Sequence, residues 1–482
     1  MKLYEKYSPS NVLRFFEYLS SVPHGSGNTK RISDLCVKFA KERGLDCIQD
    51  EWNNIIIKKP GSKGKEDCEP VILQGHLDMV CAKLPDDPVD MSVTPVKLIC
   101  DGEWLYADKT SLGGDNIFAI STIMAILDDD TLSHPPIEAL FTTDEETGMF
   151  GAAGLDASHL KGRRMLNLDS EEEGVFTVSC AGGVRANCTL PVKRTSAAGQ
   201  VCYEITVGGL LGGHSGMEIA KERGNSNKLA ARMLFDAAKR FGLRLCTLEG
   251  GVFDNVITAK TTATVAVDED KSAYFEKLIE EYDKIYKNEF ASSDPGVYVT
   301  AEKTVYKGEA VTAEDTERAL RCLFVLPQGV QTMSVDIQGL PETSLNMGIL
   351  KLEDNELKFN FSIRSSVGTK KEDLYNKVET LVTMCGGSVE PKNRYPEWAY
   401  RKESPVRDTA LEAYRKIYGK EAVISATHGG LECGLFSEKM PGLDCVSFGP
   451  EMYDVHSVRE RLNLPSAERI YKLVCLILEK LK

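Results

Sequence analysis

Short apolar segments alternate with a helical segment near the start of this 482-residue chain, and this pattern limits the possible folds more than any other feature. The clearest apolar segments are residues 54–57, 71–74, 136–142 and 164–168, and residues 116–128 have the composition of an apolar helix. Apolar runs of about four to eight residues are typical of strands that a sheet buries on both faces. The alternation therefore predicts an α/β domain in which helices flank a mixed sheet.

The pattern changes after Gly182 and Gly183. Residues 203–207 and 261–267 alternate as in antiparallel strands, and long amphipathic helices are predicted at 227–241 and 272–290. The first pattern returns from about residue 393, with a strand at 444–448 and a terminal helix at 467–481 that Ser466 would cap. We predict one α/β domain, formed by residues 1–183 and 392–482, that is interrupted by an α+β domain of residues 184–391. The insertion is about twice the size of a single four-stranded lobe, roughly 100 residues, so two lobes are expected.

Composition excludes several classes of partner. Lys and Arg total 58 against 72 Asp and Glu, and a net charge of −14 disfavours nucleic acid and anionic membrane surfaces. No apolar run approaches the roughly 18 residues that a membrane span needs. The 14 cysteines contain no CxxC pair, and the first residues have no apolar signal region, so a reducing, cytoplasmic location is expected.

Titratable side chains follow the apolar strands repeatedly. In open α/β sheets, ligands bind beyond the carboxyl ends of the strands. One such residue alone is most often a turn or cap residue, but a series at one edge of a sheet indicates a site. The series consists of His76 and Asp78, the tandem Glu145 and Glu146, Asp169, His456, and Asp115 at the start of the 116–128 helix.

Such a crowd of carboxylates would repel one another and raise their pKa values unless cations were bound. Two imidazoles and three carboxylates suit Zn²⁺ better than Ca²⁺ or Mg²⁺, which prefer oxygen ligands alone. Two ions fit if one carboxylate bridges them, and two-metal hydrolytic sites separate their ions by ~3.5–4 Å. These ligand types are therefore compatible with a pair of zinc ions, for which Co²⁺ or Mn²⁺ could substitute.

Two further acids have predicted roles beside the metals. The i, i+2 spacing of His76 and Asp78 places both side chains on one face of an extended segment, so that Asp78 can orient the imidazole. In the tandem pair, one glutamate can bind metal while its neighbour takes a proton from water.

Five motifs, in order along almost the whole chain, resemble those of the aminoacyl-histidine dipeptidases, a group of cytosolic dipeptidases in the M20 metallopeptidase family. The motifs are GHLDMVC at 75–81, TDEETGM at 143–149, NLDSEE at 167–172, GGHSG at 212–216 and HGGLECG at 428–434. The resemblance implies that His76 and Asp169 bind one zinc ion, that Glu146 and His456 bind the other, and that Asp115 bridges them. It also implies that Asp78 is the orienting acid and Glu145 the general base.

The same resemblance makes the inserted domain a lid that contributes substrate contacts. His214 would hold substrate and stabilise the oxyanion, either in its own active site or in that of a partner chain, which leaves a homodimer open. The other expected substrate contacts are Asn255, Arg364, His428 and Gly429. The chain departs from the family pattern at Asp254, where an arginine is usual, at Thr258, where proline is common, and at Ile117 and Phe118, where glycine is preferred.

The resemblance implies a di-zinc peptidase that hydrolyses dipeptides, either Xaa-His dipeptides such as carnosine or a broader set. Two alternatives remain. One is a related M20 amidohydrolase that acts on N-acyl amino acids or other short peptides. The other is a non-catalytic metal-binding protein, which is disfavoured because Glu145 and all five expected ligands are present.

Overall fold

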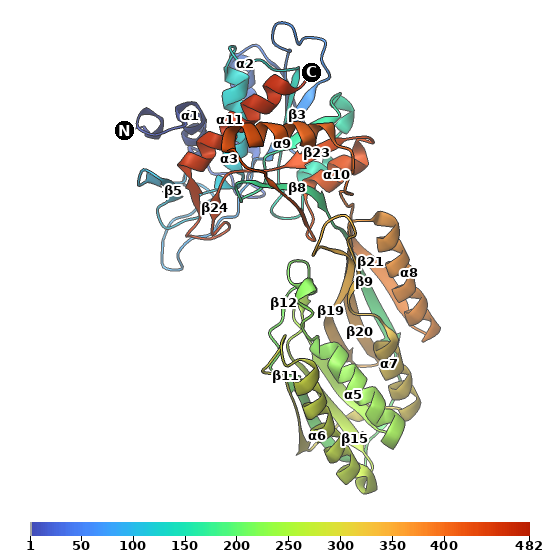
Figure 1. Cartoon of the computed structure of the whole chain (residues 1–482). Helices are drawn as coiled ribbons and strands as arrows, with labels where there is room; N and C mark the ends of the chain where they lie inside the picture. The colour runs from blue at the N-terminus through green and yellow to red at the C-terminus, as the bar shows by residue number, and fades with distance from the viewer. Residues whose placement is uncertain (1) are drawn as a thin grey trace. The chain divides into compact units, whose positions relative to one another are not determined.

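The computed structural model describes residues 2–482 and divides the chain into two compact units (Figure 1). Unit 1 consists of Met1–Ser179, Tyr400–Ala426 and Leu431–Lys482, and unit 2 consists of Cys180–Ala399 and Thr427–Gly430. Of the helices within residues 2–482, none has the length and apolar character that a membrane crossing requires.

Unit 1 is built on an eight-stranded mixed sheet. The central strands β6, β3, β7 and β23 are parallel to one another, whereas β1 with β2, β2 with β6 and β8 with β23 pair antiparallel. The strand order is β1-β2-β6-β3-β7-β23-β8-β22. The strands are β1 (Asp46–Gln49), β2 (Ile55–Lys59), β3 (Val71–His76), β6 (Ile137–Thr142), β7 (Arg164–Asn167), β8 (Val175–Cys180), β22 (Val423–Thr427) and β23 (Asp444–Ser447).

Helices flank this sheet, as the sequence predicts. Helix α3 (Gly114–Asp128) packs against β3 and is buried along nearly its whole length, which explains its uniformly apolar sequence. The other helices of unit 1 are α1 (Ser10–Ser20), α2 (Lys30–Glu42), α4 (Phe150–Gly154), α9 (Pro405–Tyr418), α10 (Glu432–Lys439) and α11 (Leu464–Lys480). A second sheet of unit 1 has the order β24-β25-β5-β4 and contains β4 (Leu98–Cys100), β5 (Trp104–Ala107), β24 (Met452–Tyr453) and β25 (Arg461–Asn463).

The predicted cap of the terminal helix is wrong. Helix α11 begins at Leu464, and the Asn463 side chain accepts a hydrogen bond from the Ser466 backbone N–H. Ser466 therefore lies inside the first turn rather than before it. The reason is that Pro465 occupies an early helical position, where its missing N–H costs nothing.

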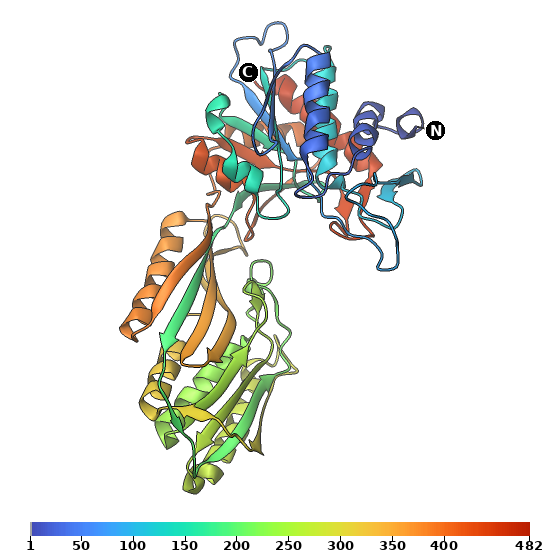
Figure 2. The same cartoon turned by 180° about the vertical axis from the view of Figure 1, so that it is seen from behind.

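Unit 2 contains one antiparallel nine-stranded sheet. Its order is β16-β11-β15-β13-β19-β20-β9-β21, with β18 paired to β19. Figures 1 and 2 show α5, α6 and α7 on one face of this sheet. The strands are β9 (Gly182–Pro191), β11 (Val201–Gly208), β13 (Arg244–Gly250), β15 (Thr261–Val267), β16 (Tyr298–Thr304), β18 (Gly329–Met333), β19 (Pro341–Glu353), β20 (Glu356–Ser365) and β21 (Ser388–Tyr395), and the helices are α5 (Ser226–Phe241), α6 (Ser272–Glu289), α7 (Ala313–Val325) and α8 (Gly368–Met384).

The nine-stranded sheet has two halves, which meet where β13 pairs with β19. Strands β13 and β19 join them through only two residue pairs, Glu249 with Lys351 and Gly250 with Leu350. One cluster of buried apolar side chains nevertheless extends through both halves, so they share a core.

Candidate active site

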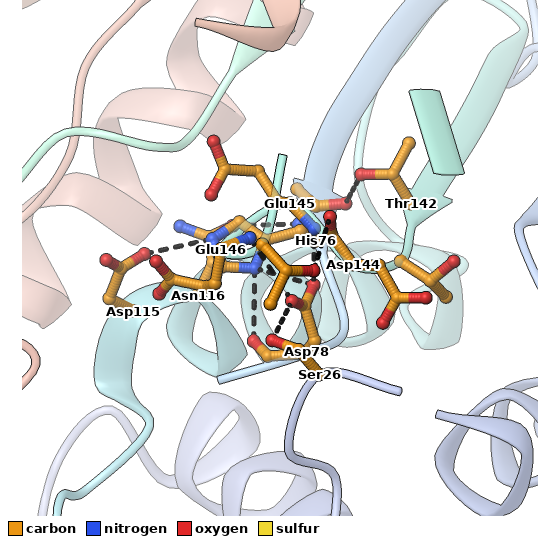
Figure 3. A network of polar contacts seen from close by, with 12 residues as sticks. Ser26, His76, Asp78, Asp115, Asn116, Thr142, Asp144, Glu145 and Glu146 are labelled. Carbon is orange, nitrogen blue, oxygen red and sulfur yellow. Dashed lines mark hydrogen bonds and ion pairs between the residues drawn. The ribbon is translucent and has the colours of Figure 1, made fainter. Parts of the chain in front are cut away.

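The titratable residues that follow the strands of unit 1 meet at one edge of its sheet. Figure 3 shows His76, Asp78, Asp115, Glu145 and Glu146 of this group. His76 is the last residue of β3, and Asp115 lies in the first turn of α3. Glu145 and Glu146 follow β6, and Asp169 follows β7. His456 lies in the loop between β24 and β25. Because β3, β6 and β7 are mutually parallel, their carboxyl ends bring these side chains together.

Asp115 is the centre of this group. Its Oδ1 lies 3.1 Å from His76 Nε2, and its Oδ2 lies 3.1 Å from His456 Nε2. The two imidazoles also contact one further acid each. His76 Nε2 is 3.4 Å from Asp169 Oδ1, and His456 Nε2 is 2.8 Å from Glu146 Oε1. One carboxylate thus faces two different histidines, each with an acid of its own.

Asp78 connects His76 with the tandem glutamates. Its Oδ1 lies 3.4 Å from His76 Nδ1, which also contacts the Asp78 backbone oxygen at 3.1 Å. The same carboxylate accepts hydrogen bonds from the backbone N–H groups of Glu145 and Glu146 at 3.0 and 3.3 Å. The Ser26 hydroxyl donates a further bond of 2.7 Å to it. Asp78 therefore fixes both the imidazole and the start of the loop that carries the two glutamates.

The carboxylates shift the pKa values of both histidines upward in the metal-free protein. Burial alone would lower the pKa of His76, but the charge of Asp169 and hydrogen bonds to Asp115, Asp169 and Asp78 outweigh it, and the pKa rises well above 6.5. A hydrogen bond to Asp115 and the close contact with the Glu146 carboxylate raise the pKa of His456 to about 10. Burial opposes ionisation of Asp115, yet contact with the two imidazoles holds its pKa well below the usual range.

Glu145, Glu146 and Asp169 resist ionisation. Burial is the main cause that raises the pKa of Glu145, and the negative charges of Asp169, Glu432 and Glu146 add to it. Burial likewise raises the pKa values of Glu146 and Asp169. This is the repulsion that the sequence predicts for a carboxylate cluster without cations, and a bound metal would relieve it.

The donor set fits a metal ion. One ligand atom from each of His76, Asp115 and Glu146 can be chosen so that all lie within 4.8 Å of one another. Glu146 Oε1 is buried and makes no well-directed hydrogen bond despite its closeness to His456. A buried carboxylate oxygen without a hydrogen bond is costly, and a cation among these atoms would satisfy it.

Glu432, at the start of α10, is a buried acid of this region to which the sequence analysis gave no role. Its Oε2 accepts hydrogen bonds from Gln74 Nε2 at 2.6 Å and from Thr142 Oγ1 at 2.8 Å. Burial raises the pKa of Glu432 to about 8, so this carboxyl is mostly protonated at neutral pH. Gln74 and Thr142 lie on β3 and β6, so Glu432 ties together two strands that end at the site. Only its position after the glycine loop at 428–430 could have drawn attention to it.

The remaining predicted residues belong to unit 2. His214 forms part of the two-residue strand β12 (Gly213–His214), and its Nδ1 accepts N–H bonds from Gly216 and Met217 at 3.2 and 3.1 Å. Burial, with the charges of Arg364 and Arg185, lowers the pKa of His214. A neutral imidazole that accepts at Nδ1 carries its proton on Nε2. His214 therefore presents an N–H donor.

His428 and Arg364 lie close together in unit 2. His428 Nε2 is 2.7 Å from Ser344 Oγ, and burial and the charge of Arg364 lower the pKa of His428 to about 3. The Arg364 guanidinium donates to Tyr395 Oη at 2.9 Å, while its buried Nε has no partner among the described residues. Gly429 donates its backbone N–H to Thr427 Oγ1 at 3.1 Å, and the Asn255 backbone oxygen accepts one from Ser215 at 2.8 Å.

The structure supplies a partner for Asp254, which departs from the family pattern. Arg185 Nε donates to Asp254 Oδ2 at 2.7 Å, and Arg185 Nη1 donates to Ser362 Oγ at 2.7 Å. Arg185 pairs in register with Ser362, two residues from Arg364 on the same strand, so the two arginines share a face of the sheet. The acidic departure at Asp254 is thus matched by a basic residue on β9.

Comparisons with known proteins identify the family to which the chain belongs. Residues 72–480 match the family described as peptidase family M20/M25/M40. The chain is 35% identical over 475 residues to the cytosol non-specific dipeptidase of Escherichia coli (strain K12), and the match covers 98% of each chain.

Solved structures show the same relationship. The structure of the aminoacylhistidine dipeptidase from Vibrio alginolyticus matches with a TM-score of 0.96 and 34% identity, over 99% of this chain and 98% of that one. The aminopeptidase PepT from Bacillus cereus ATCC 10987 matches at a TM-score of 0.57 and 15% identity, over 98% of both chains, which shows a shared fold. The resemblance drawn from the motifs is confirmed: the chain belongs to the M20 peptidase family.

Proposed function

We propose that this protein is a cytosolic metallo-dipeptidase that binds two zinc ions per chain. The observation that carries the proposal is the position of Asp115, whose two carboxylate oxygens each lie 3.1 Å from a different imidazole. A carboxylate in that position can bridge two ions. His76 and Asp169 would complete one ion's protein ligands, and His456 and Glu146 would complete the other's.

A bound metal pair would supply Lewis acidity and a water molecule whose pKa falls towards ~7. Glu145 is then the group that takes a proton from water and later gives one to the leaving amine. Its partly buried carboxyl, with a raised pKa, suits both tasks because it holds a proton more readily than an exposed glutamate does. Asp78 anchors the backbone N–H of Glu145 and contacts His76, so it positions base and ligand together.

We assign the substrate contacts to unit 2. The Nε2–H of His214 would donate to the oxyanion that develops on the peptide carbonyl. Arg364, with His428, Gly429 and Asn255, would hold the substrate carboxylate, for which a buried guanidinium with an unpaired Nε–H is a suitable donor.

Two relatives support a dipeptide as the substrate. One is named a non-specific dipeptidase and the other an aminoacylhistidine dipeptidase, and each match covers at least 98% of this chain. We therefore propose free dipeptides as the substrate class, with Xaa-His dipeptides such as carnosine among them.

A substrate panel with metal control tests this function. The protein should hydrolyse free dipeptides, lose activity after chelation, and regain it when Zn²⁺, Co²⁺ or Mn²⁺ is added back. N-acetylated dipeptides and N-acyl amino acids form the matched controls, since they have the same bond without the free amine. Preferential hydrolysis of the N-acyl compounds would favour an amidohydrolase instead, and no metal-dependent hydrolysis of either class would refute the proposal.

Metal affinity should increase with pH. In the metal-free protein the pKa of His456 is raised to about 10, so a proton competes with the metal at every pH below that value. Binding must displace this proton, and the apparent affinity should therefore rise at least tenfold per pH unit between pH 6 and pH 8. Competition with a chromophoric chelator at pH 6, 7 and 8 measures the slope. An affinity that is flat over this range would contradict the assignment of His456 as a ligand.

A further inference from the structure

Glu460 holds a buried carboxylate against four consecutive backbone N–H groups. Its side chain is only 2% exposed. Its Oε2 accepts from Leu112 at 2.8 Å and Gly113 at 3.1 Å, and its Oε1 accepts from Gly114 at 2.7 Å and Asp115 at 3.3 Å. The four donors belong to a segment that lies about 350 positions earlier in the sequence. Charge-assisted hydrogen bonds of this number hold the backbone of that segment against the Glu460 side chain.

The local sequence is suited to this arrangement. Gly113 adopts a left-handed conformation with φ of 71°, and Asp115 and Asn116 also depart from helical geometry before α3 continues. Successive N–H groups in such a turn form a concave anion-binding site. A Cβ on Gly113 would lie 2.8 Å from Met79 Sδ, so a side chain at this position would displace Met79 in addition to the strain of the positive φ. The Glu460 carboxyl group occupies the concave site, and burial raises its pKa to about 7 despite the backbone N–H donors.

Glu460 is itself held firmly. It lies four residues after His456 and directly before β25, whose residues Arg461–Asn463 pair with Trp104–Tyr106 of β5. The backbone of Glu460 is thereby anchored by one sheet while its side chain fixes residues 112–115. The loop before Glu460 carries His456, and residues 112–115 include Asp115. The contact of 3.1 Å between His456 and Asp115 lies at the centre of the metal site.

We propose that Glu460 is a positioning residue of the metal centre, which sets Asp115 and His456 at the separation that lets both bind metal. The inference rests on the metal site assigned under the proposed function. Glu460 touches no expected ligand side chain. Glu460 acts through the backbone of Asp115. It holds the Asp115 carboxylate between the two imidazoles before any ion binds, so metal binding need not order the Asp115 side chain.

A purely structural role would predict a different outcome. Glu138 offers the comparison, because it is also a buried carboxylate of unit 1 that accepts backbone N–H bonds. Its oxygens accept from Lys161 at 3.1 and 2.9 Å and from Gly162 at 2.9 Å, and it is 4% exposed. It lies near the start of β6, at the opposite end of the strand from the site. Loss of either carboxylate should destabilise unit 1, but only loss of Glu460 should weaken metal binding.

The test measures Zn²⁺ affinity by chelator competition in Glu460→Gln and Glu138→Gln. In Glu460→Gln, the side-chain amide would point N–H groups at backbone N–H groups, and Zn²⁺ affinity should fall by about 10–100-fold, as is typical for loss of an outer partner of a ligand. Glu138→Gln should bind Zn²⁺ as the parent does, although its metal-free thermal unfolding temperature should also fall. The Co²⁺ absorption spectrum should change only in Glu460→Gln, because ligand geometry changes there.

A second variant keeps the proposal testable if Glu460→Gln does not fold. Glu460→Asp keeps the charge but is one methylene shorter, and its affinity should fall between those of the parent and Glu460→Gln. Parental affinity in either Glu460 variant would overturn the proposal, as would an equal loss in Glu138→Gln. If both Glu460 variants fail to fold while Glu138→Gln folds, the role is one in folding and the proposal is wrong. A parent that binds no metal would instead refute the proposed metal site itself.

Discussion

Replacement of Glu145 by alanine is expected to reduce kcat by about 10²–10⁴-fold, the usual contribution of a general acid–base group. The metal content should remain two ions per chain, because Glu146, and not Glu145, contacts His456. KM should change little, since Glu145 acts on water rather than on the bound substrate. Steady-state kinetics with a dipeptide, together with metal analysis of the same sample, measures both quantities.

Asp144 provides the matched control for this experiment. It precedes Glu145 in the same loop, and its Oδ1 accepts the Gly27 backbone N–H at 2.6 Å rather than contacting the expected ligands. Asp144→Ala should keep kcat within a few-fold of the parent. Glu145→Gln, which keeps the shape of the side chain, should be as inactive as Glu145→Ala. Turnover at the parental rate in Glu145→Ala would exclude this residue as the base.

The sheet of unit 1 was predictable because burial on both faces makes its central strands continuously apolar. The predicted segments at 71–74, 136–142 and 164–168 correspond to β3, β6 and β7. Once these strands are parallel, the residues that follow them must share an edge, which is why His76, Glu146 and Asp169 could be grouped from sequence alone. Weakly patterned strands such as β22, which is exposed at Val423, gave no such signal.

Residues whose role depends on contacts with distant parts of the chain could not be found in this way. Glu460 and Glu432 are single acids that belong to no periodic pattern. Their structural roles depend on hydrogen-bond partners hundreds of residues away in the sequence. The ion pair between Arg185 and Asp254 could not be predicted for the same reason. Strand register places Arg185 beside Ser362 and Arg364, and the register cannot be read from the sequence. Local chemistry predicted which residues could bind metal, whereas tertiary structure determines which residues hold them in place.

Removal of the Asp115 carboxylate is expected to abolish the metal pair. Loss of one partner from a buried ion pair costs about 3–5 kcal/mol. At 1.4 kcal/mol per factor of ten, this corresponds to about 10²–10³-fold or more in affinity for each ion that the carboxylate serves. Asp115→Ala and Asp115→Asn should therefore purify without bound zinc and show no dipeptide hydrolysis at ordinary zinc concentrations. Asp128→Ala is the matched control, since Asp128 ends the same helix and pairs with Arg14 and Arg43 instead.

The metal-free variant gives an independent check of the same geometry. Because the hydrogen bond to Asp115 is the first cause that raises the pKa of His456 to about 10, Asp115→Asn should lower that pKa towards 6.5. A histidine with a raised folded-state pKa stabilises the protein below its unfolded pKa of about 6.5 and loses this contribution as pH rises towards 10. The metal-free parent should thus lose stability between pH 7 and pH 10 more steeply than metal-free Asp115→Asn. NMR titration of His456 and thermal unfolding across this range measure the two effects, and an unchanged His456 pKa in the variant would show that Asp115 is not its partner.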